Sequence, residues 1–216
     1  MSLASSLRQR LVRVLSTLDD EGVLGPRLTG DALRLWDRVR HFMELKLAAA
    51  PVDLDVIELA CYALQLPTRQ GRGLIAGRLG RTNLRDRCEQ AAELLVTLLG
   101  DDIDPEMVDR ATKLLLEVPQ RSPKLPAARL LADAINLEDF GAIGLFGQII
   151  QLGLQGEGLT ELVEACDKRD QYGYWEARLK DGFHHGPIRE LARSRVDEAR
   201  AIAAKLRAEL EQDRPA

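Results

Sequence analysis

Apolar side chains recur along most of this chain at the spacing of an α-helix, and no segment alternates between apolar and polar residues as a half-buried strand does. Short stretches rich in Pro, Gly, Asp and Asn separate the periodic segments. The pattern predicts an all-α fold of about nine helices joined by short loops. It shows no internal repeat and no low-complexity tract.

In the first half of the chain, cap and breaker residues mark the limits of four expected helices. Asp31 and Asn83 are expected N-caps, whereas Pro51 and Asp53 open a helix that Pro67 closes. A linker with Pro26 is expected from Gly22 to Gly30. The expected helices cover about 3–18, 31–50, 51–66 and 83–99, and the first carries its apolar stripe on Leu3, Leu7, Leu11, Val14, Leu15 and Leu18.

In the second half, Asp104-Pro105 is expected to start a helix, with Pro at the first helical position. Residues 119–126 read as a loop, and 127–153 as two helices joined near Phe140-Gly141. Further helices are expected over 159–169, 172–180 and from Pro187 onward. We expect an N-terminal helix and linker over 1–25, a single all-α domain over 26–211 and a disordered tail over 212–216.

Bulk composition narrows the function classes. With 216 residues, 45% of them hydrophobic and 30% charged, the chain can bury a full core. A formal net charge of −4 argues against a nucleic-acid binder. Cys61, Cys88 and Cys166 are far apart and odd in number, which is typical of reduced thiols in the cytoplasm. No apolar run is long enough for a membrane helix or a secretory signal, so no membrane partner is expected.

Three segments combine apolar residues with a few polar or glycine positions. They read Leu35-Trp36-Asp37-Arg38-Val39, then Leu59-Ala60-Cys61-Tyr62-Ala63-Leu64-Gln65-Leu66-Pro67, then Asp133-Ala134-Ile135-Asn136-Leu137-Glu138-Asp139-Phe140-Gly141-Ala142-Ile143-Gly144. In their order and spacing, and with the C-terminal Tyr174-Trp175-Glu176 segment, they resemble the HD-domain superfamily over about residues 31–210. That family comprises all-α, metal-dependent phosphohydrolases, and the resemblance is greatest to small stand-alone bacterial members.

The resemblance implies where the family's metal ligands would stand. The first His falls at Leu35, the His-Asp doublet at Leu64 and Gln65, and the last Asp at Ile135. Aliphatic side chains have no lone pairs for a divalent cation, and a glutamine offers only a neutral carbonyl. We therefore expect a filled apolar site without metal or other cofactor, and a catalytically inactive member of the family.

Acidic residues leave a second hypothesis open, which is phosphate-ester hydrolysis at a rearranged site. Its candidates are Asp133, Glu138 and Asp139, with Arg38 beside them. For Asp133 we favour hydrogen bonding to backbone or to an arginine such as Arg38 over a residual cation site. Further acids, Asp37, Asp53, Asp55 and Glu58, are expected on polar faces and in first helical turns. The adjacent His184 and His185 are interpreted as a solvated loop or helix cap before the last helix rather than as a metal site.

A cluster of arginines gives a third hypothesis. Residues 68–87 contain six arginines, Arg69, Arg72, Arg78, Arg81, Arg85 and Arg87, and one acid, Asp86. Because arginine grips phosphate through a bidentate fork, Arg69, Arg72, Arg78 and Arg81 are candidates for holding an anion or a nucleotide. A surface loop paired with acids elsewhere is the favoured interpretation of the same residues.

These patterns favour a non-catalytic binding, scaffolding or regulatory module. A metal-dependent phosphohydrolase with a rearranged acidic site, and a sensor of nucleotide or phosphate, remain the alternatives. The sequence leaves open whether the partner is a small anion, another protein or a second copy of the chain.

Overall fold

The computed structural model describes residues 7–9, 11–13, 15, 28–47, 51–66, 83–99 and 104–212. Within these ranges it has nine α-helices, one short 3-10 helix and no strand, which confirms the predicted all-α fold of about nine helices. Contacts along the chain divide it into two compact units, Met1–Ala132 and Asp133–Ala216. That the main domain begins at residue 26 and ends at residue 211 stays a prediction.

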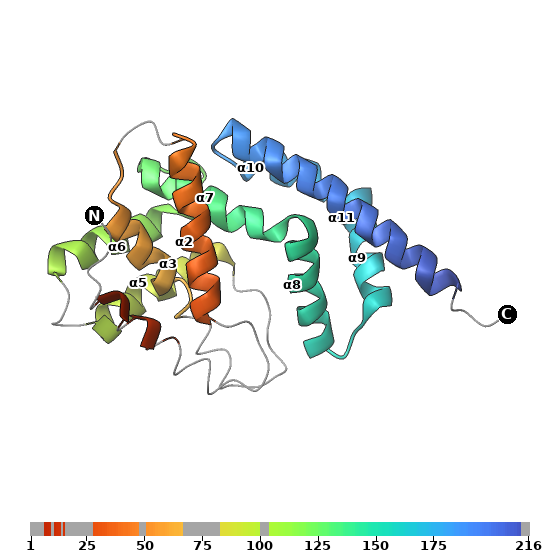
Figure 1. The fold of residues 1–216 in the computed structure, drawn as a ribbon, viewed down its shortest axis with the longest axis horizontal. Coiled ribbons are helices and arrows are strands. Elements are labelled where there is room, and N and C mark those ends of the chain that lie inside the picture. The colour runs from red at the N-terminus through yellow and green to blue at the C-terminus, as the bar shows by residue number, and fades with distance from the viewer. Residues whose placement is uncertain are drawn as a thin grey trace. The chain divides into compact units, whose positions relative to one another are not determined.

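The first unit is built around one short, buried helix. It contains α2 (Leu28–Glu44), α3 (Leu54–Ala63), α5 (Leu84–Leu99), α6 (Pro105–Glu117) and the first part of α7 (Pro126–Asn136). Helix α3 packs against α2, α5 and α6, and α5 lies along α6 (Figure 1). Every residue of α3 from Val56 to Ala63 is buried. A helix that is apolar on nearly all sides is stable only inside a core, which is where α3 lies.

Local capping signals set the starts of three of these helices, as predicted. The Asp53 carboxylate accepts hydrogen bonds from the backbone N–H groups of Asp55 and Val56 at the start of α3. The Asn83 side chain accepts from the Asp86 N–H at 2.8 Å before α5. Asp104 caps α6, with Pro105 as its first residue. Each cap satisfies N–H groups that have no partner within the helix.

The predicted limits of α2 are wrong. The helix begins at Leu28, so Asp31 lies in its first turn, where it contacts Arg34, and does not cap it. The helix ends at Glu44, short of Ala50, and Lys46 adopts a left-handed φ of 54° in the turn that follows. An acid is favoured both at the cap and in the first turn by the positive end of the helix dipole, so the sequence signal does not separate the two.

The second unit packs three helices against the longest one. It contains η2 (Leu137–Asp139), α8 (Gly141–Leu154), α9 (Leu159–Gln171), α10 (Tyr174–Asp181) and α11 (Gly186–Gln212). Helix α11 contacts α8, α9 and α10 (Figure 1, blue for α11). The core between these helices is formed by Leu145, Leu162, Cys166, Ala199 and Ala203. In the described ranges, no helix combines the length and apolar character that a membrane crossing requires.

The junction between α7 and α8 carries an aromatic cluster. Phe140 separates η2 from α8, which confirms the predicted joint at Phe140-Gly141. Its ring centroid lies 5.2 Å from that of Trp175 on α10 and 5.3 Å from that of Phe183 in the α10–α11 connection. All three rings are buried, so they fix the connection between α10 and α11 against the segment that follows α7.

Candidate functional site

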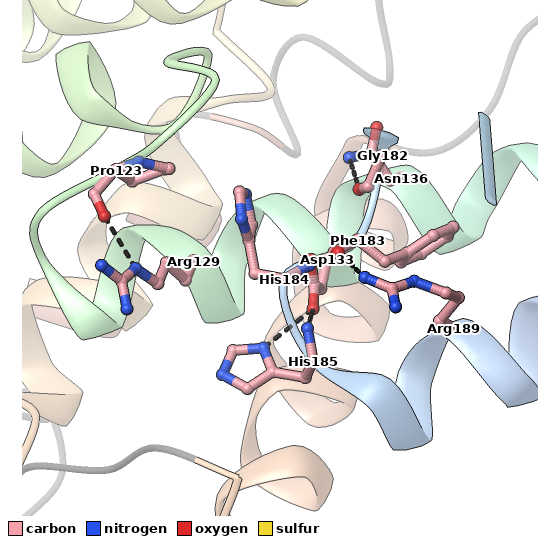
Figure 2. A network of polar contacts seen from close by, with 9 residues as sticks. All are labelled: Pro123, Arg129, Asp133, Asn136, Gly182, Phe183, His184, His185 and Arg189. Carbon is pink, nitrogen blue, oxygen red and sulfur yellow. Dashed lines mark hydrogen bonds and ion pairs between the residues drawn. The ribbon is translucent and has the colours of Figure 1, made fainter. Parts of the chain in front are cut away.

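Asp133, near the end of α7, holds the segment that leads into α11. Its carboxylate accepts a hydrogen bond from the His184 backbone N–H at 2.8 Å and one from the His185 N–H at 2.9 Å. It also lies 2.8 Å from Nδ1 of the His185 ring (Figure 2). Asp133 is fully buried, with no exposed surface. The predicted role of Asp133 as a backbone hydrogen-bond acceptor is therefore confirmed.

His185 immediately precedes the first residue of α11, and its carbonyl accepts the Arg189 N–H. Because an ionised carboxylate can only accept, Nδ1 is the donor in its contact with Asp133. In the neutral imidazole this leaves Nε2 as an acceptor. The His185 side chain is 16% exposed. Asp133 can hold the His185 imidazole in place as a hydrogen-bond acceptor or a weak base. The main role that the contacts indicate is structural, since Asp133 on α7 accepts the N–H of the residue directly before α11, as a helix cap does.

A second polar cluster binds the end of α7 to α10. The Asn136 side-chain amide donates to the Gly182 carbonyl at 2.6 Å (Figure 2), and its oxygen accepts from Nη2 of Arg178 at 3.1 Å. The same Arg178 nitrogen donates to the Asp139 carboxylate at 2.9 Å. Asp139, one of the acids of the predicted rearranged site, is thus already engaged by an arginine.

Two positions after Asp139 have little or no room for a side chain and therefore need glycine. Gly141 has a φ of +74°, and an added Cβ there would lie 3.1 Å from Cβ of Arg195. At Gly144 an added Cβ would collide with the Asp139 carbonyl oxygen. Backbone cannot yield as a flexible side chain does, so Gly144 is fixed by packing of the first turn of α8 against η2.

The positions where the family resemblance places metal ligands are buried. Leu35 on α2 and Leu64 after α3 are 1% and 0% exposed, and Gln65 is 4% exposed. Arg87 on α5 donates to the Leu64 carbonyl at 2.9 Å and to the Gln65 side-chain oxygen at 3.3 Å. Ile135 is 8% exposed and lies in the second unit, whereas the other three belong to the first. That all four share one site stays a prediction.

The remaining predicted site residues are placed only in part. Arg69, Arg72, Arg78 and Arg81 lie outside the described residues, so the anion-binding hypothesis for them stays a prediction. Arg38 lies on α2 in the first unit and Glu138 in η2, and both make interactions within the structure. The predicted pairing of Arg38 with Asp133 also stays a prediction.

Glu58 does not lie on a polar face, contrary to the prediction. It is fully buried on α3, and Arg8 binds both of its oxygens, at 2.6 and 2.8 Å. The two residues are 50 positions apart, so no local pattern in the sequence pairs them. A buried carboxylate needs such a partner, which is why α3 can carry an acid among apolar residues.

The three cysteines are free and buried. Burial raises the pKa of the Cys88 thiol to about 12, and burial is also the main cause that raises the pKa of Cys166. A thiol that stays protonated is a poor nucleophile and a poor metal ligand. Across the ranges that the structure describes, no three His, Cys, Asp or Glu side chains are grouped so as to hold a metal ion.

Sequence reasoning missed a charged groove between α10 and α11, because its charged lining residues lie on two helices that only the folded chain brings together. Comparison of the chain with family models, with curated proteins and with solved structures finds no match.

Proposed function

We propose that this chain is a non-catalytic binding or regulatory module with an HD-like all-α fold. One observation carries the proposal, which is that the two neighbouring positions of the implied His-Asp doublet are occupied by a buried leucine and a buried glutamine. Arg87 donates to the Leu64 carbonyl and to the Gln65 amide oxygen. A cation placed there would meet the positive guanidinium of Arg87 instead of a carboxylate.

The energetics of metal binding support the same proposal. A divalent cation that enters a protein recovers its dehydration cost only through several oxygen or nitrogen ligands, some of them anionic. Leu35 and Leu64 offer hydrocarbon, and they are among the largest fully buried side chains of the described residues. Their burial stabilises the fold by roughly 1.5–3 kcal/mol each.

The rearranged acidic site has less support. Both oxygens of Asp133 already accept hydrogen bonds from the connection that leads into α11, which leaves them less capacity for a cation or a substrate. Asp139 is paired with Arg178 at 2.9 Å.

Metal analysis and turnover assays test the proposal. We expect purified full-length protein to retain no tightly held ion, and to show no turnover of phosphomonoesters or nucleotides with Mn²⁺, Mg²⁺ or Ni²⁺. Turnover that is lost in Asp139→Asn and Glu138→Gln would instead establish the acidic site. One tightly held transition-metal ion per chain would contradict the proposal directly. The matched control is Asp109→Asn on α6, which removes an exposed acid that pairs with Lys113 on the same helix.

The location and partners belong to the same proposal. Three free, buried thiols support a cytoplasmic location, where thiols stay reduced. A protein partner or a second copy of the chain is compatible with a binding module, and light scattering over a concentration series would reveal the second copy.

A further inference from the structure

Helices α10 and α11 border a groove of about 490 Å³ within the second unit. Leu179 and Val196, which are 8% and 2% exposed, form its apolar floor. Charged residues from both helices form its rim, namely Glu176, Lys180, Arg189, Arg193, Asp197 and Arg200. The volume falls in the range of sites for small molecules.

One end of the groove is neutralised by the protein itself. Arg200 lies 2.8 Å from the Asp170 carboxylate, 3.1 Å from Glu176 and 3.7 Å from Asp197. Three carboxylates therefore surround one guanidinium. This end has no positive charge left to attract an anion.

The other end, where α10 finishes and α11 begins, has an excess of positive charge. Arg193 pairs with the exposed Glu190, one turn before it on the same helix. Arg189 donates through Nη2 to the Phe183 carbonyl at 2.7 Å (Figure 2), and its buried Nε finds no hydrogen-bond partner among the described residues. Within the part of the chain that the structure describes, no carboxylate pairs with Arg189 or with the exposed Lys180. Lys180, Arg189 and Arg193 thus line the same groove, whereas its carboxylates Glu176 and Asp197 pair with Arg200.

We propose that Lys180, Arg189 and Arg193 bind the phosphoryl group of a small phosphate-bearing ligand, whose remaining part lies over Leu179 and Val196. Two planar guanidinium groups and one ammonium match the oxygens of a phosphoryl group. The backbone bond from Arg189 to Phe183 holds one guanidinium in place before the ligand arrives, which lowers the entropy lost on binding. This inference rests on the proposed function in one respect, because it assigns the groove to binding and not to catalysis.

Inorganic pyrophosphate is the probe for this site, titrated calorimetrically into the full chain at constant ionic strength. We expect saturable binding that Lys180→Ala combined with Arg193→Gln weakens by at least about tenfold, the effect of losing charge-assisted hydrogen bonds. Both side chains are exposed, so the variant should fold, which circular dichroism checks. A control is Lys205→Ala, which removes one exposed cation farther along α11, outside the groove.

The proposal is overturned if millimolar pyrophosphate gives no binding, or if the double variant binds as tightly as the parent chain. An equal loss in Lys205→Ala would show unspecific attraction and also overturn it. Binding that survives the double variant but is lost in Arg72→Ala with Arg78→Ala would move the anion site to the arginine-rich segment. Hydrolysis of bound pyrophosphate with Mg²⁺ would refute the non-catalytic function while leaving the groove as the binding site.

Discussion

Replacing Asp133 tests how much of the second unit depends on one buried carboxylate. In Asp133→Ala, the N–H groups of His184 and His185 and the ring N–H of His185 all lose their acceptor. In Asp133→Asn, the shape is kept but one oxygen becomes an NH₂ group. In either orientation of the Asn side-chain amide, its NH₂ group faces a backbone N–H group, so two donors oppose each other. Rotating the amide by 180° therefore does not restore the lost hydrogen bond.

The magnitudes follow from the number of donors left without an acceptor. Each buried donor that loses its partner costs about 1–3 kcal/mol, and the partial exposure of His185 lets water offset part of the loss. We expect Asp133→Ala to lower the free energy of unfolding by about 3–5 kcal/mol and Asp133→Asn by about 2–3 kcal/mol. His185→Ala leaves both backbone bonds intact and should cost about 1 kcal/mol.

Urea unfolding followed by far-ultraviolet circular dichroism measures the three losses near neutral pH. Amide hydrogen exchange adds a local readout, since the His184 and His185 N–H groups should lose protection in both Asp133 variants. The reasoning is refuted if Asp133→Asn unfolds within about 0.5 kcal/mol of the parent chain, the size of an ordinary surface change. It is equally refuted if His185→Ala costs as much as Asp133→Ala.

Three further outcomes follow from single contacts. Gly144→Ala should cost at least about 2 kcal/mol, whereas Gly147→Ala on the same helix, with open space at its Cβ, should gain about 0.5–1 kcal/mol in thermal melts. Arg8→Met should lower the free energy of unfolding by about 2–3 kcal/mol, because it leaves the Glu58 carboxylate buried without its partner. Adding Glu58→Gln to Arg8→Met should restore most of this loss. A double variant as unstable as Arg8→Met would show that the ion pair is not the cause. Burial raises the pKa of Cys88 to about 12 in the folded protein, so between about pH 8 and about pH 10 this thiol ionises only in the unfolded chain. The free energy of unfolding should therefore fall by about 2 kcal/mol over this pH range. A Cys88→Ala variant whose stability falls with pH by the same amount would contradict this.

Helix starts were predictable because their signals are local. Asp53, Asn83 and Asp104 each bond to N–H groups two or three residues ahead, so the sequence that forms the cap also displays it. Asp31 shows the limit of this reasoning. An acid in the first turn of α2 gains from the same dipole as an acid at the cap, and the sequence pattern alone does not distinguish the two positions.

The contacts that define the candidate site were not predictable in detail because they join distant residues. Asp133 and His185 are 52 positions apart, and Arg8 and Glu58 are 50 apart. An acid between apolar residues indicates that some partner exists, since an unpaired buried charge is costly. It does not say which of the 30 Lys and Arg residues or which backbone group provides it. The α10–α11 groove was missed for the same reason, because its two rims form a site only once the helices pack.

The segment from Asp133 to Gly144 contains residues whose contacts in the structure are needed for packing and hydrogen bonding. Asp133 caps α11 from a distance, and Gly144 has no room for a side chain beside the Asp139 carbonyl. Loss of either residue would damage the fold whether or not a metal ever binds. The structural roles of these positions are therefore no evidence of catalysis. Stability and turnover must be measured on the same Asp133→Asn variant. A large loss of stability with no turnover in the parent chain separates a structural acid from a catalytic one.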